Sequence, residues 1–185
     1  MKRDARRRMV VTTAKLLRRQ GYYGTGLNQI VAESEAPKGS IYFHFPGGKE
    51  QLAAEAIGAS AEYIDAGLRA CERGSALESV DTYLVETMRV LEQSDFADGC
   101  PIATVVLEVG PTSKVIGDAC ADAVEVLLSR VAGWLERDGC TPEAARERGQ
   151  LIYAAVEGSL MFAKGLRSTE PLAALRRQLP ALLAR

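Results

Sequence analysis

The segment from Lys38 to Phe45, Lys-Gly-Ser-Ile-Tyr-Phe-His-Phe, combines side chains that proteins use to contact DNA. Lys38 can reach a guanine edge or a phosphate. Gly39 would let the backbone approach closely, because any side chain there would hold the segment away from the groove. Ser40 can donate or accept a hydrogen bond and discriminates weakly between bases. This chemistry suits a short helix that enters a DNA major groove.

Aromatic residues of the same segment could extend these contacts. Tyr42 and His44 carry planar polar groups that can reach phosphates at the groove wall, and Phe43 could pack on a thymine methyl. Three alternatives stay open: Tyr42 and Phe43 could belong to the core, and His44 could be a solvated surface residue. Thr25, near the start of a preceding helix, would bring its hydroxyl and the helix N-terminus to a phosphate.

The same residues offer little for catalysis. His44 is the single histidine of the chain, and Ser40 lies four residues away, so a hydrogen bond between them is feasible. A nucleophilic mechanism needs a third group to orient the base, and the sequence supplies neither that group nor a glycine-rich phosphate loop. We therefore expect no enzyme and no cofactor.

Cysteine spacing argues against a structural metal site. Cys71, Cys100, Cys120 and Cys140 are widely spaced and form no C-x-x-C pair. Buried free thiols in a reducing cytoplasm are expected. One alternative remains, a thiol-based redox-sensing regulator that uses Cys100 with another cysteine.

Charge is distributed unevenly along the chain. The net charge is −1, yet residues 1–50 carry ten Lys and Arg against four Asp and Glu, and the remainder is acidic. A basic end can meet phosphates, whereas an acidic body argues against a protein that coats DNA generally. No segment approaches 18 consecutive apolar residues, and the Arg-rich N-terminus leads into an amphipathic helix, so we expect no membrane contact and a cytoplasmic location.

The periodicity is helical throughout, which predicts an all-α fold. Three N-terminal helices would form a helix-turn-helix domain over residues 1–48, with Ile41 and Phe45 facing its core. These helices are predicted at 4–20, 26–34 and 37–45, the last with Pro37 at its first position.

A larger helical domain for ligand binding and dimerisation would cover residues 49–185, giving about nine helices in all. Its helices are predicted at 49–72, 76–93, 102–108, 113–138, 142–166 and 171–183.

Small residues recur in the helix predicted at 142–166 and would permit close helix packing. With the last helix, this pattern predicts a four-helix dimer interface, and the alternative is an intramolecular crossing. The residues are Ala154, Ala155, Gly158, Ser159 and Ala163.

The chain resembles the TetR family of bacterial one-component regulators. Gly21–Thr25, Ile30–Ala32 and Lys38–Phe45 carry the resemblance, and Phe45–Glu50 with Gly99–Ala103 are similar to its LmrA/YxaF-like subgroup. That subgroup is associated with genes for multidrug efflux or small-molecule response. Many family members have Ser or Thr where Pro37 stands, so this chain lacks that hydroxyl.

The resemblance implies a function. It implies a dimeric repressor on a palindromic operator of double-stranded DNA, released by a small amphipathic or drug-like effector, with Lys49 contacting a phosphate. The effector would bind among the helices of the body, where each candidate residue could instead be core, and where Glu108 or Glu157 could simply cap a helix. The candidates are Met88, Phe96, Cys100, Glu108, Trp134, Tyr153, Glu157 and Phe162.

Overall fold

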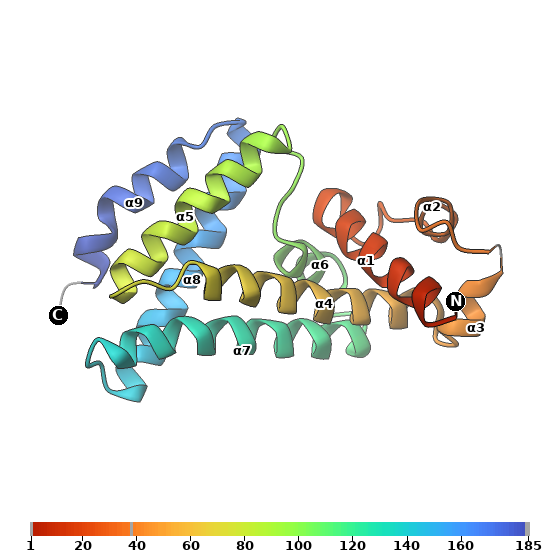
Figure 1. Cartoon of the computed structure of the whole chain (residues 1–185), viewed down its shortest axis with the longest axis horizontal. Helices are drawn as coiled ribbons and strands as arrows, with labels where there is room; N and C mark the ends of the chain where they lie inside the picture. Colours follow the sequence, from red (N-terminus) through yellow and green to blue (C-terminus); the bar gives the residue numbers. More distant parts are fainter. Residues whose placement is uncertain (1, 38, 184–185) are drawn as a thin grey trace. The chain divides into compact units, whose positions relative to one another are not determined.

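The computed structural model describes residues 2–37 and 39–183, and within these ranges all regular secondary structure is helical. The expected all-α fold with nine helices is confirmed (Figure 1). The helices are α1 (Lys2–Gln20), α2 (Leu27–Glu33), α3 (Ser40–His44), α4 (Gly48–Ala70), α5 (Ala76–Gln93), α6 (Pro101–Val109), α7 (Lys114–Arg137), α8 (Pro142–Leu166) and α9 (Glu170–Leu183).

Contacts divide the chain into two compact units. The first unit contains residues 1–62 and 100–124, and the second contains residues 63–99 and 125–185. Helices α4 and α7 each contribute residues to both units. This division is structural, and the functional boundary expected after residue 48 stays a prediction.

The first unit packs α1, α2, α3 and the start of α4 around an apolar core. Ile41 and Phe45 both lie in it, at 4% and 0% exposure, as their four-residue spacing predicted. The short α3 is thus fixed by two buried side chains rather than by its own length. The core residues are Met9, Leu16, Ile30, Ile41, Phe45 and Leu52.

The start of α3 differs from the prediction. The helix begins at Ser40 and not at Pro37, because Gly39 at its N-cap has a φ of 86°, in the left-handed region. A residue in that conformation cannot continue a right-handed helix. The Ser40 N–H donates to the Pro37 carbonyl at 3.1 Å, which closes a turn before α3. By contrast, α5 and α8 have the predicted bounds.

Arginines of α1 hold the neighbouring helices of the first unit. Arg8 Nε donates to the Ser34 carbonyl at 2.9 Å, and its NH2 donates to the Glu35 carbonyl at 3.3 Å. These bonds satisfy carbonyls at the C-terminal end of α2, which lack partners inside the helix. Arg6 NH2 donates to Glu55 Oε1 of α4 at 2.7 Å.

In the second unit α5, α8 and α9 pack together (Figure 1). Helix α9 contributes Leu172, Leu175 and Leu179, which are all buried. Thr141 caps α8 by accepting from the Ala144 N–H, and Pro142 occupies the first turn, where no N–H is needed. Among the residues described, every helix is too short or too polar to span a bilayer.

Candidate nucleic-acid interface

Helix α3 presents two large aromatic side chains to solvent. Tyr42 is 65% exposed and Phe43 is 67% exposed, so neither belongs to the core. Their neighbours Ile41 and Phe45 are buried and anchor the opposite side of the helix. The two rings are therefore accessible on the side of α3 that faces away from the core.

His44 and Ser40 are less accessible than their aromatic neighbours. The His44 ring is half-buried and packs edge-to-face on Phe43, with the ring centroids 5.0 Å apart. The Ser40 hydroxyl oxygen is buried and has no hydrogen-bond partner in the described part of the chain. Gly39 faces open space, so its left-handed turn, rather than crowding, requires glycine. Lys38 lies outside the described residues.

Thr25 stabilises the turn between α1 and α2. It is fully buried, and its hydroxyl donates to the Gly21 carbonyl at 2.6 Å. Its N–H donates to the Tyr22 carbonyl at 3.1 Å. The hydroxyl proton is thus used inside the first unit, and a phosphate contact by Thr25 stays a prediction.

Lys49, at the start of α4, lies against an aromatic ring. Its ammonium nitrogen is 4.1 Å from the centroid of the Tyr22 ring, a cation–π contact. Burial lowers the pKa of Lys49, and the nearby Glu108 carboxylate opposes that shift. Lys49, the predicted phosphate ligand, therefore already interacts with Tyr22 and Glu108 within the chain.

Glu108 lies in the first unit, at the turn that follows α1. Its Oε2 accepts from the Tyr22 N–H at 2.5 Å and from the Tyr23 N–H at 3.3 Å. The sequence suggested either an effector contact or a helix cap for this residue, and the structure places it on the amides just beyond the end of α1. The contact joins residues 86 positions apart, so no local pattern could reveal it.

Cys100, the other effector candidate of the first unit, caps α6. Its sulfur accepts from the Ala103 N–H at 3.5 Å. This contact places the thiol at the helix N-terminus, where the cysteine is 9% exposed.

The six remaining effector candidates belong to the second unit and differ in burial. Trp134 is 1% exposed, and its Nε1 donates to Glu72 Oε2 at 3.4 Å. Phe162, in contrast, is 58% exposed. The other four, Met88, Phe96, Tyr153 and Glu157, are half-buried.

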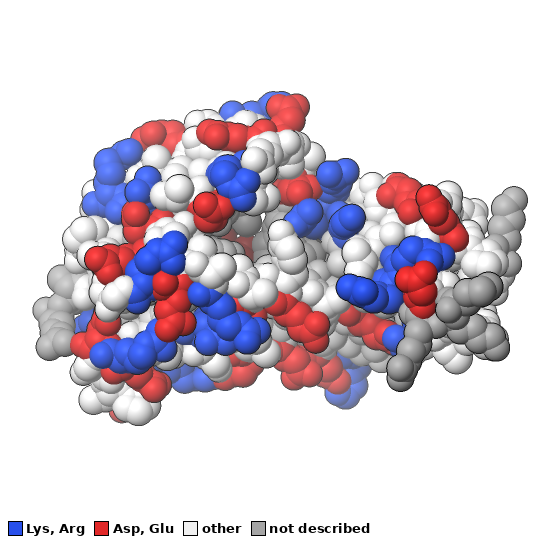
Figure 2. Space-filling model, viewed as in Figure 1, with Lys and Arg blue, Asp and Glu red and all other residues white. Residues whose placement is uncertain are grey.

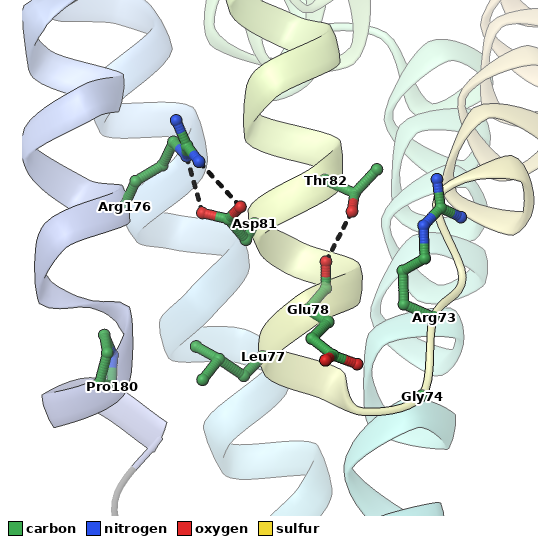
Figure 3. A pocket seen from close by; sticks show the side chains of 8 residues that line it. All are labelled: Arg73, Gly74, Leu77, Glu78, Asp81, Thr82, Arg176 and Pro180. Atoms are coloured by element: carbon green, nitrogen blue, oxygen red, sulfur yellow. Dashed lines mark hydrogen bonds and ion pairs between the residues drawn. The ribbon is translucent and has the colours of Figure 1, made fainter.

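A groove in the second unit runs between α5 and α9 (Figure 3). It encloses about 570 Å³ and is crossed by the pair Asp81–Arg176, whose two hydrogen bonds measure 2.7 and 2.8 Å. A second groove of about 450 Å³ shares Leu77 and Pro180 with it. None of the eight effector candidates lines either groove. Sequence analysis missed both, since their walls come from helices distant in the chain.

Charged side chains of both signs are interspersed on the face shown in Figure 2. In the first unit Arg6 pairs with Glu55 at 2.7 Å and Arg8 pairs with Asp4 at 2.5 Å. The basic composition of the N-terminal third is thus partly neutralised by local ion pairs.

Family models match most of the chain. Residues 10–56 match "Bacterial regulatory proteins, tetR family", and residues 76–178 match "Transcriptional regulator LmrA/YxaF-like, C-terminal domain". The chain belongs to the TetR family. Its LmrA/YxaF-like character, suggested by two short motifs, is confirmed. TetR-family relatives are transcriptional regulators, and this chain is a regulator of that family.

Curated relatives cover nearly the whole chain. The HTH-type transcriptional regulator LmrA of Bacillus subtilis is 34% identical, over 98% of both chains. The regulator YxaF of the same organism is 30% identical, over 97% of this chain and 95% of its own.

A TetR regulator from Chloroflexus aurantiacus has a related solved structure. It is 25% identical and superposes with a TM-score of 0.81, over 100% of this chain and 96% of its own.

Proposed function

We propose that this TetR-family regulator is a repressor that binds a palindromic operator as a homodimer and is released by a small amphipathic or drug-like effector. It acts in the cytoplasm and catalyses no reaction. The observation that carries the proposal is the exposure of Tyr42 and Phe43 on α3, whose other side is anchored by Ile41 and Phe45. The two aromatic side chains are exposed on one side of α3, and the buried residues on its other side fix the direction in which they point.

Two copies are needed because one short helix contacts only a few base pairs. In a dimer, two recognition helices about 34–36 Å apart enter successive major grooves and provide the missing specificity. Tyr42, His44 and Lys49 would contact phosphates, Phe43 would contact a base, and Lys38 would contact a base or a phosphate. The open space at Gly39 would let the backbone approach the groove closely.

The dimer surface lies on α8, with α9 beside it. Exposed apolar residues follow one stripe of α8 at helical spacing, and a second copy of the chain would cover them. Gly158 lies on the same stripe, and a Cβ added there would meet nothing within 4 Å in this chain. The stripe contains Leu151, Phe162 and Leu166, exposed by 54%, 58% and 69%, with Met161 beside it at 61%.

Effector binding in the second unit would act through α4. This helix starts at Gly48, directly after the α3 segment, and continues into residues of the second unit. A ligand that displaces α4 would separate the two recognition helices from their grooves. By linkage, such a ligand must bind the DNA-free form more tightly, and DNA must weaken its binding by the same factor. The side chains with which we expect contact are the effector candidates of the second unit, Met88, Phe96, Trp134, Tyr153, Glu157 and Phe162.

A thiol-based redox sensor is the alternative regulator. Burial raises the pKa of the Cys71 and Cys120 thiols, which lowers the fraction of reactive thiolate. Cys100 is buried too, at 9% exposure. The ligand-responsive mechanism is therefore preferred. Treatment with peroxide should leave DNA binding of the wild type and of Cys100→Ser equal, whereas release of the wild type alone would support the redox mechanism.

The proposal is tested by selecting duplexes from a random DNA library with the full chain. Enriched duplexes should contain an inverted repeat, and sedimentation should give two chains per duplex. A thermal-shift screen then finds small ligands, and calorimetry compares their affinity for the free and DNA-bound protein. Equal affinities in both forms would exclude that ligand as an inducer, and enrichment of no sequence would overturn operator binding.

A further inference from the structure

We propose that Glu108 is a positioning residue for DNA binding, which holds the turn between α1 and α2 from helix α6. This inference rests on the proposed function, because it assigns a role in the DNA contact of that same unit. Glu108 itself is not a DNA ligand. It acts through two backbone amides and through the residues that those amides fix.

The carboxylate occupies the position where the chain turns out of α1. Gly21 has a φ of 71°, which ends the helix, and the next two N–H groups then point to Glu108 Oε2. A Cβ at Gly21 would overlap Glu108 Oε1. Glycine is thus needed here both for its conformation and for the close approach of the carboxylate. Hydrogen bonds from amides to a charged acceptor are among the stronger ones in proteins.

Two parts of the DNA-contacting region depend on this turn. Toward α2, Thr25 binds back to the Gly21 carbonyl, so the entry into α2 is fixed to the residue that Glu108 covers. Toward α4, the Lys49 ammonium nitrogen lies 4.1 Å from the centroid of the Tyr22 ring. One carboxylate therefore orients both the first helix of the helix-turn-helix pair and a predicted phosphate ligand.

Two conservative variants of Glu108 distinguish the effect of its side-chain length from the effect of its negative charge. Glu108→Asp keeps the negative charge, so its repulsion of DNA is retained, but the shorter side chain cannot reach both amides. Glu108→Gln keeps the length and an acceptor oxygen but removes the charge. If Glu108 acts by holding the turn, Asp is the more harmful replacement. If it acts only as a negative charge near DNA, Asp is neutral and Gln strengthens binding.

The experiment measures affinity for a duplex selected by the wild type, together with amide hydrogen exchange at Tyr22 and Tyr23. Glu62→Asp is the matched control, because Glu62 is an exposed residue of α4 in the same unit. We expect Glu108→Asp to weaken binding about tenfold, the size of a lost charge-assisted hydrogen bond, and to speed exchange of both amides. Glu108→Gln should bind within about threefold of the wild type.

Unchanged affinity and exchange in Glu108→Asp would overturn the inference, as would stronger binding by Glu108→Gln with neutral Asp. Measurements are made at a temperature where circular dichroism shows every variant folded, which removes loss of folding as an explanation. Failure of the wild type to select any duplex counts against the proposed function. Selection by the wild type followed by neutral variants counts against Glu108 alone.

Discussion

The guanidinium of Arg130 and the carboxylate of Asp65 form a two-point ion pair in the second unit. Arg130 Nε lies 2.7 Å from Asp65 Oδ1, and its NH2 lies 3.3 Å from Oδ2. Arg69, one turn along α4 from Asp65, adds a third contact at 2.6 Å. Asp65 is only 6% exposed, so these arginines replace the water that a carboxylate normally binds. The pair joins the second-unit segments of α4 and α7.

Replacement of Asp65 by Asn should lower the free energy of unfolding by about 2 kcal/mol, because two arginines then lose a charged partner. The value lies below that of a fully buried pair, since the Arg130 side chain is 29% exposed. Urea denaturation measures the change. Asp118→Asn is the control, because the Asp118–Lys114 pair is exposed and should contribute under about 0.5 kcal/mol. Equal effects of the two substitutions would contradict the assignment.

The same pair predicts a pH dependence of stability. Hydrogen bonding from Arg130 holds the pKa of Asp65 below its ordinary value. A carboxylate with a lowered folded-state pKa stabilises the protein above its unfolded pKa of about 3.9, and this stabilisation is lost as the pH falls through the folded value. The stability difference between wild type and Asp65→Asn should therefore be constant from pH 7 to about 5 and shrink below about 4. A difference that grows on acidification would show the opposite shift.

Truncation of the exposed aromatic residues should weaken DNA binding without loss of stability. Phe43→Ala should cost about 1–3 kcal/mol on a selected duplex and little on random DNA, as expected for a base contact. Tyr42→Ala should weaken both similarly, as expected for a phosphate contact. Tyr63→Ala is the control, because Tyr63 is 67% exposed like Phe43 but lies in the second unit. Fluorescence anisotropy measures the affinities, and a Phe43 variant that binds like Tyr63→Ala would remove Phe43 from the interface.

If the chain dimerises through α8 as proposed, Gly158→Arg should yield a monomer. The open space at Gly158 lets an arginine fit within one chain, so the folded monomer should persist while a second copy meets a charged side chain. Gly58→Arg is the matched control, since Gly58 is an exposed glycine of α4 with equally open surroundings. Analytical ultracentrifugation distinguishes the outcomes. A Gly158 variant that remains dimeric would place the interface away from this stripe.

The positions of the helices were predicted well, because the features that mark a helix lie close together in the sequence. Pro142 marked the start of α8, and the four-residue spacing of Ile41 and Phe45 predicted two core residues of α3. The start of α3 was predicted at Pro37, because proline favours the first turn of a helix. Gly39 has a left-handed backbone conformation, so the helix cannot start before it. Glycine adopts left- and right-handed conformations about equally readily, so the sequence could not show which of the two Gly39 has.

Site residues were harder to predict where tertiary contacts decide their role. The spacing of Ile41 and Phe45 predicted their burial, but the sequence left open whether Tyr42 and Phe43 also belong to the core. Only the packing of α3 shows that both of these rings are exposed. Thr25 is still predicted to contact a phosphate, and the structure adds a hydrogen bond from its hydroxyl to the Gly21 carbonyl that the sequence did not reveal. Glu108 was one of the expected effector residues. Its carboxylate accepts a hydrogen bond from the Tyr22 amide, which lies 86 positions earlier in the chain.

The contact between Glu108 and the α1–α2 turn affects how this regulator can be recombined with its relatives. A chimaera joined at residue 48 would carry the turn at Gly21–Tyr23 but face it with a foreign α6. Without a carboxylate at the matching position, two amides would lose their acceptor and Lys49 a nearby negative charge. If Glu108 positions the DNA contact as proposed, a graft that exchanges operator specificity should transfer residues 101–109 together with the N-terminal helices, because the two segments are separate in the sequence.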